Sequence, residues 1–262
     1  MRLCAAAALA GCAACALPVV SAGTFLPAGD LQRGDVHASI SMEAGRVLAG
    51  PSDVHDLPAT PPEAQKWEVS TWVASDASLR WQAFRRVAFE AQVKLTNPIV
   101  PFTPALVGGS VGTRVRVFER TGDTGLAVEL GARGVGVAVE QRIDRSTDGR
   151  SQTDFWDYRA FGVEVPAVAT WRVNSLFAVT ASPFLRAYWI RAWHTEVVGL
   201  TRTQAALLWS PVLSGGVGGS ASLSLGPIEI SPGAALELVT RPGPGAGTRV
   251  IFEPGVSLGT RF

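Results

Sequence analysis

The chain has 262 residues, of which 47% are hydrophobic and only 17% charged, and its formal net charge is +1. Ordinary soluble domains carry about 25% charged residues. Because the net charge is close to zero, we do not expect a nucleic-acid partner that binds through the overall charge of the protein. Beyond the amino-terminal segment, no stretch approaches the roughly 20 consecutive apolar residues that a membrane-spanning helix needs.

The amino-terminal segment predicts a secretory signal, because a short basic start is followed by a small apolar run. Small residues before Gly23 suit ordinary cleavage there. Alternatively, Leu9-Ala10-Gly11-Cys12 resembles a lipobox, in which Cys12 becomes the lipidated first residue. We therefore expect a signal peptide over 1–22 (ending before Cys12 in the lipobox alternative), a lead over 23–34 and one domain over 35–262. All three cysteines lie in the signal, so the mature body has no disulfide or thiol nucleophile.

Apolar and polar residues alternate along most of the remaining chain, which predicts strands because successive side chains of a strand point to opposite faces. The run from Val87 to Leu95 shows the alternation most clearly, and no segment has a convincing helical period. The predicted strands span 35–48, 67–84, 87–97, 107–120, 125–140, 155–172, 175–193, 203–222, 226–240 and 248–262.

The connections between these strands alternate in length. Those after the second, fourth, sixth and eighth strands are tight, whereas longer polar or proline-rich connections span 49–66, 98–106, 141–154 and 194–202. Short turns at one end and long loops at the other are typical of transmembrane barrels. The sequence therefore predicts an all-β fold: a single closed antiparallel up-and-down transmembrane β-barrel of about ten strands.

The strand alternation also sorts the charged residues onto one face. A charge on the lipid-facing side costs about 2–4 kcal/mol near the midplane, so the charged face belongs inside. We expect acids and bases there to pair as an ion network that occludes the lumen, because ten strands are close to the eight that side chains alone can fill. A narrow porin-like channel or transport component is the alternative. The predicted network comprises Glu90, Lys94, Arg114, Arg116, Glu129, Arg133, Glu164, Arg186, Glu229 and Glu253.

Two further patterns support a barrel in a bilayer. Trp81 and Trp171 fall near tight turns, and the other six tryptophans fall near the long connections, as two interfacial belts require. Gly131, Gly134 and Gly136 coincide with a switch of the apolar face in the fifth strand, which predicts a bulge or a bend. The glycine run 215–219 lacks a phosphate-binding fingerprint and indicates strand curvature.

The last strand alternates up to the aromatic Phe262. It resembles the terminal strand of Gram-negative outer-membrane β-barrel proteins. The resemblance implies an outer-membrane location, contact with outer-membrane lipids, and insertion by the outer-membrane assembly machinery, which reads the terminal segment with Phe262. It implies no cofactor and no substrate.

No catalytic, cofactor or metal site is predicted, and we expect a non-enzymatic role in structure or surface recognition. His55, within Asp53-Val54-His55-Asp56, and His194 leave a surface hydrolase as an alternative. Omptin-type surface proteases share only the strand number and location, so none of their residues is carried over. We expect any binding of an unknown surface ligand to use the long loops 49–66 and 141–155.

Overall fold

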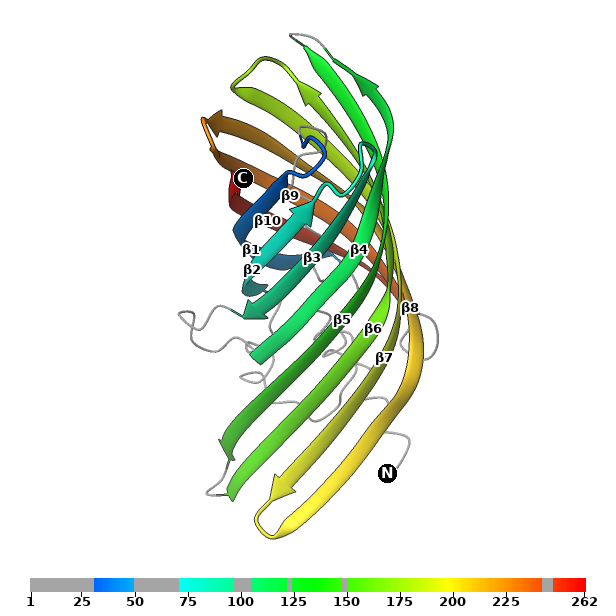
Figure 1. Ribbon diagram of the computed structural model, residues 1–262. Coiled ribbons are helices and arrows are strands. Elements are labelled where there is room, and N and C mark those ends of the chain that lie inside the picture. Colours follow the sequence, from blue (N-terminus) through cyan, green and yellow to red (C-terminus); the bar gives the residue numbers. More distant parts are fainter. Residues whose placement is uncertain (1–30, 50–70, 97–104, 122–123, 148–149, 242–246) are drawn as a thin grey trace.

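The computed structural model describes residues 31–49, 71–96, 105–121, 124–147, 150–241 and 247–262. These residues form ten antiparallel strands that close into a barrel (Figure 1), which confirms the predicted fold. No helix in these ranges is long and apolar enough to cross a membrane. The strands are β1 (Val36–Ala49), β2 (Thr71–Trp81), β3 (Val87–Thr96), β4 (Ala105–Arg120), β5 (Gly125–Thr147), β6 (Arg150–Arg172), β7 (Phe177–Val198), β8 (Thr201–Leu225), β9 (Ile228–Arg241) and β10 (Gly247–Arg261).

Each strand pairs with its neighbours in the sequence, and β1 pairs with β10 to close the sheet. The seam is continued by Val36 and Phe262, whose backbone N–H groups donate to each other's carbonyl oxygens at 3.2 and 2.9 Å. Closure is required because lipid offers no hydrogen-bond partner to an open sheet edge. The predicted pairing of the first and last strands is therefore confirmed.

Strands β5 to β8 are 22 to 25 residues long, whereas the other strands have 10 to 16 residues. They form two long hairpins at the end opposite the tight turns, at the bottom of Figure 1. The prediction of loops over 141–154 and 194–202 is wrong. Strand β5 stays paired with β6 up to Thr147 and Arg150, and β7 stays paired with β8 up to Val198 and Thr201. These segments are polar because both faces of a strand beyond the bilayer meet water, so the apolar alternation that marks a membrane strand is lost.

For strand β5 the prediction of a bulge is wrong, whereas the alternative of a bend stays a prediction. Its register with β6 is continuous through the glycines, and Val135 and Val137 are buried on the inner face, so the valines do not switch to the lipid side. A bulge lies instead on β4, where the register with β5 shifts between Arg116 and Phe118. As a result Val117 and Phe118 are both exposed on the outer surface, and Glu119 comes to the side on which it pairs with Arg116.

The outer surface carries a continuous apolar band. On β6 the outward positions between Phe161 and Trp171 hold only valine and alanine, and Val163 and Val165 are 52% and 54% exposed. Aromatic side chains mark both edges: Phe161 stacks on Trp189 with ring centroids 5.7 Å apart, and Trp81 stacks on Phe89 at 6.0 Å. A strand segment of ten residues, tilted by about 40° from the barrel axis, spans about 25 Å along that axis. This is the height of the apolar band of transmembrane barrels. The outward apolar positions, Val163 and Val165 among them, therefore form a band of the height expected for contact with lipid.

Placing one charge in this band tests the assignment. Leu185 pairs with Val165 near the middle of the band and is 69% exposed, whereas Leu200 lies at the β7–β8 turn beyond it and is 106% exposed. We expect Leu185→Arg to destabilise the folded barrel by about 2–4 kcal/mol, because the charge enters lipid. Leu200→Arg should change the free energy of unfolding little. Urea titrations of folding into lipid vesicles measure both, and equal effects would contradict the lipid-facing band.

Candidate functional site

The barrel interior holds the largest group of charged side chains. In the described part of the chain, thirteen ionisable side chains other than histidine are buried, and none is more than 8% exposed. They include every residue of the predicted network except Glu229, which is half-buried near the tight turns and accepts a hydrogen bond from Ser231 at 2.9 Å. The buried acids are Glu43, Asp76, Glu90, Glu129, Glu164, Glu237 and Glu253, and the buried bases are Arg80, Lys94, Arg114, Arg116, Arg133 and Arg186.

A row of alternating charges crosses five neighbouring strands at the centre of this set. Glu90, Gly112, Arg133, Glu164 and Arg186 are successive register partners from β3 to β7. Glu164 accepts hydrogen bonds from Arg133 Nη2 and from Arg186 Nε, both at 2.6 Å. Arg186 continues to Glu237 on β9 at 2.9 Å, and Arg114 pairs with Glu90 at 2.7 Å. We call Arg114, Glu90, Arg133, Glu164, Arg186 and Glu237 the ion row.

Two glycines allow the ion row to pass over the intervening strands. Gly112 lies on β4 between Glu90 and Arg133, whose carboxylate and guanidinium are 3.5 Å apart. A Cβ atom added at Gly112 would lie 2.8 Å from the Cα of Arg133. Gly216 lies on β8, where an added Cβ would lie 2.6 Å from Cζ of Phe184. The curvature expected from the glycines of β8 stays a prediction, and Gly216 leaves room for Phe184 inside the lumen.

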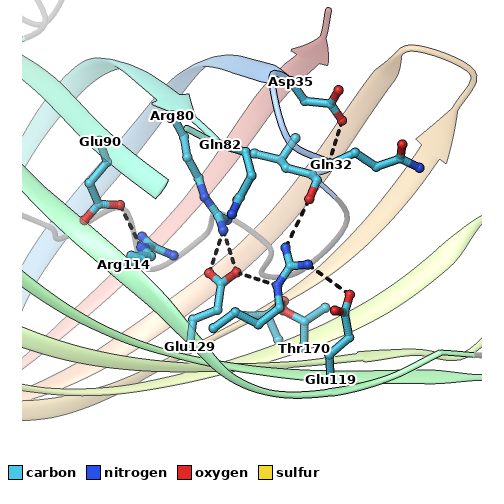
Figure 2. Close-up of polar contacts among 12 residues, drawn as sticks. Gln32, Asp35, Arg80, Gln82, Glu90, Arg114, Glu119, Glu129 and Thr170 are labelled. Atoms are coloured by element: carbon cyan, nitrogen blue, oxygen red, sulfur yellow. Dashed lines mark hydrogen bonds and ion pairs between the residues drawn. The ribbon is translucent and has the colours of Figure 1, made fainter. Parts of the chain in front are cut away.

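A second cluster closes the end of the barrel that carries the tight turns. Arg80 Nη2 donates to both carboxylate oxygens of Glu129, at 2.6 and 2.7 Å (Figure 2). Arg116 contacts Glu129 at 3.5 Å and Glu119 at 2.9 Å, and its Nη2 donates to the carbonyl oxygen of Leu31 at 3.2 Å. Leu31, which precedes β1, is 5% exposed. The residue Leu31, just before the first strand, is therefore held inside the tight-turn end of the barrel by this hydrogen bond.

A third group and an apolar layer occupy the rest of the lumen. Lys94 forms an ion pair with Glu43, and Glu253, which interacts electrostatically with Lys94, has no hydrogen-bond partner among the described residues. Towards the long hairpins the inward positions become apolar. This apolar layer comprises Val135, Val137, Ala160, Tyr188, Val212, Val239 and Ile251, all 9% exposed or less.

Sequence reasoning missed Glu43, Asp76 and His37 among the inward residues. The signal was present, because His37, Ser39, Ser41 and Glu43 alternate with apolar residues along β1. The burial of Leu31 has no counterpart in the sequence pattern, since this residue precedes the first strand.

Of the remaining predicted residues, His194 and Phe262 belong to the described chain and lie away from the lumen cluster. Cys12 and His55 lie outside the described residues, and His194 lies in β7 at a backbone position paired with Trp156 and Ala205. Phe262 is 76% exposed at the end of β10. Within the described ranges no group of three or more His, Cys, Asp or Glu side chains has an arrangement suited to a metal ion.

A closed antiparallel barrel with an apolar outer band, aromatic edges and a charged interior defines the class of outer-membrane β-barrel proteins. No protein-family model matches the sequence, and no curated protein matches it.

Several solved barrels are similar to the chain. The translocator domain of the autotransporter NalP from Neisseria meningitidis is 11% identical with a TM-score of 0.47, covering 89% of this chain and 90% of that one. The outer membrane protease OmpT from Escherichia coli is 9% identical with a TM-score of 0.43, covering 91% and 100%. The attachment invasion locus protein Ail of Yersinia pestis is 12% identical with a TM-score of 0.37, covering 88% and 100%. No residue role is transferred from any of them.

Gly112, which lies between Glu90 and Arg133 of the ion row, provides a matched test of this packing. We expect Gly112→Val to lower the free energy of unfolding by about 1–3 kcal/mol, because the new side chain overpacks the lumen at Arg133. Gly134→Val is the control, since Gly134 is exposed on the outer face and an added Cβ there meets nothing within 4 Å. Urea unfolding in lipid vesicles compares the two variants. Equal losses of stability would refute the crossing of the ion row over Gly112.

Proposed function

We propose that this protein is a non-catalytic outer-membrane barrel with an occluded lumen, which holds its two long hairpins at the cell surface for recognition. The observation that carries the proposal is the contrast between the two ends of the barrel. One end is closed by tight turns and an internal ion cluster, and the other extends as paired strands beyond the aromatic edge.

Burial of the lumen charges supports occlusion. A conducting pore needs water-accessible polar side chains along its path, yet the six residues of the ion row are 8% exposed or less. Leu31 and Arg116 on one side of the row and the apolar layer on the other add two further barriers. These features favour a closed barrel over the narrow porin-like channel, which remains the alternative function.

The hairpins have the geometry of a display structure. Phe161 lies eleven positions along the strand from Arg150, the first residue of β6. Trp189 lies nine positions from Val198, the last residue of β7. At strand geometry these distances correspond to roughly 25 Å beyond the aromatic edge. Arg159 and Asp157 pair at 3.3 Å on this extension with side chains 58% and 36% exposed. Recognition by such a surface uses paired strands rather than the long loop first predicted over 141–155.

Cysteine labelling in intact cells tests this display. The protein's own cysteines all lie within its first 15 residues, so a cysteine introduced in the barrel is a unique reporter there. Leu200→Cys reports on the β7–β8 turn, and Ser175→Cys is the matched control in the exposed β6–β7 turn. The reagent is a polyethylene-glycol maleimide too large to cross the outer membrane.

We expect Leu200→Cys to react in intact cells and Ser175→Cys to react only after the outer membrane is permeabilised. The wild-type protein gives the background signal. Labelling of Ser175→Cys in intact cells would show that the orientation is inverted, and protection of both positions would show that the hairpins are not displayed.

A further inference from the structure

Three exposed arginines lie on neighbouring strand ends at the tight-turn end of the barrel. Arg85 and Arg86 occupy the β2–β3 turn, Arg120 ends β4, and all three are exposed. The backbone N–H of Arg116 donates to the carbonyl oxygen of Arg86 at 2.7 Å, which fastens the turn to β4. The three guanidinium groups therefore project from neighbouring strand ends. We call Arg85, Arg86 and Arg120 the rim patch.

The acidic side chains that the structure describes near this end are already engaged by the protein. Asp35 accepts a hydrogen bond from the backbone N–H of Gln32 at 2.8 Å, and Glu119 accepts one from Arg116 at 2.9 Å. Glu229 accepts one from Ser231 at 2.9 Å. Among the described residues, no acidic side chain forms an ion pair with a member of the rim patch. Within the described ranges, the three positive charges of the rim patch are thus exposed and have no acidic partner.

Aromatic side chains place the rim patch at the edge of the bilayer. Trp81, Phe84 and Phe118 are 48%, 57% and 49% exposed on the same strand ends as the arginines. Aromatic residues of this kind lie at the level of lipid head groups, where long basic side chains extend towards the phosphates. The planar guanidinium can bind two oxygens of one phosphate, and the aromatic rings beside it cover acyl chain.

We propose that the rim patch is a binding site for the phosphate groups of anionic phospholipids, in the leaflet that surrounds the tight turns. The leaflet assignment rests on the proposed function, but the chemistry of the site does not. A lipid fits better than an acidic protein domain, because the strand ends that carry these arginines also carry exposed aromatic rings, and Arg120 pairs with the outward Leu126. Arg172 and Arg261, by contrast, occupy inward register positions at the mouth.

Photo-crosslinking in nanodiscs tests the site with the full-length protein in either orientation. The probes are photoreactive analogues of phosphatidylglycerol and phosphatidylcholine, and crosslinked peptides are mapped by mass spectrometry. The test variant carries Arg85→Gln, Arg86→Gln and Arg120→Gln. The control carries Arg159→Gln, Arg191→Gln and Arg202→Gln at the other end of the barrel, with the same change of net charge.

In the wild-type protein we expect segments 81–86 and 118–120 to crosslink to phosphatidylglycerol at least about fivefold more than to phosphatidylcholine. The ratio should fall to about one in the test variant and stay high in the control. Equal crosslinking of both lipids in the wild-type protein would overturn the proposal, as would a preference that survives in the test variant or disappears equally in the control. If the triple variant does not fold, the single variants Arg85→Gln and Arg120→Gln should each lower the ratio, and an unchanged ratio would also overturn it.

Discussion

A carboxylate held between two guanidiniums is the interaction on which the rest of this barrel depends. Glu164 is fully buried and is bonded by Arg133 on one neighbouring strand and Arg186 on the other. Removing one partner from such a buried set typically costs about 3–5 kcal/mol, because an uncompensated charge stays behind. The contacts exist only in one register of β5, β6 and β7. The ion row therefore helps to fix the relative positions of these strands.

The row also explains why the two surfaces of the same strands differ so strongly. Charges can satisfy one another only on the inside, so the outward positions between the aromatic edges are apolar. Reaching across a ten-stranded lumen requires long side chains, and inward-facing glycines leave room for them. Gly112 and Gly216 lie on the strands that the row crosses. The ion row and the glycine positions are thus parts of one arrangement.

Most of the architecture could be predicted from the sequence, because lipid outside and charge inside impose a strict two-residue period. The ends of β3 and the inward position of Glu90 follow from that period alone. The hairpin extensions of β5 to β8 could not be predicted in this way, since a strand with two wet faces shows no apolar alternation. The partners of each charge depend on register, which is why Arg80 pairing with Glu129 was not foreseen. The β4 bulge that brings Glu119 to Arg116 leaves no clear mark in the sequence.

Planar-bilayer recording of the purified, refolded protein tests the occluded lumen most directly. The control is an open porin reconstituted in the same bilayers, which shows that insertion yields measurable current. Because the ion row, the cluster at Arg116 and the apolar layer each block the path, we predict no stable conductance steps from this protein. Reproducible open-channel currents, altered in ion selectivity by Arg186→Gln, would contradict the account and favour the channel function.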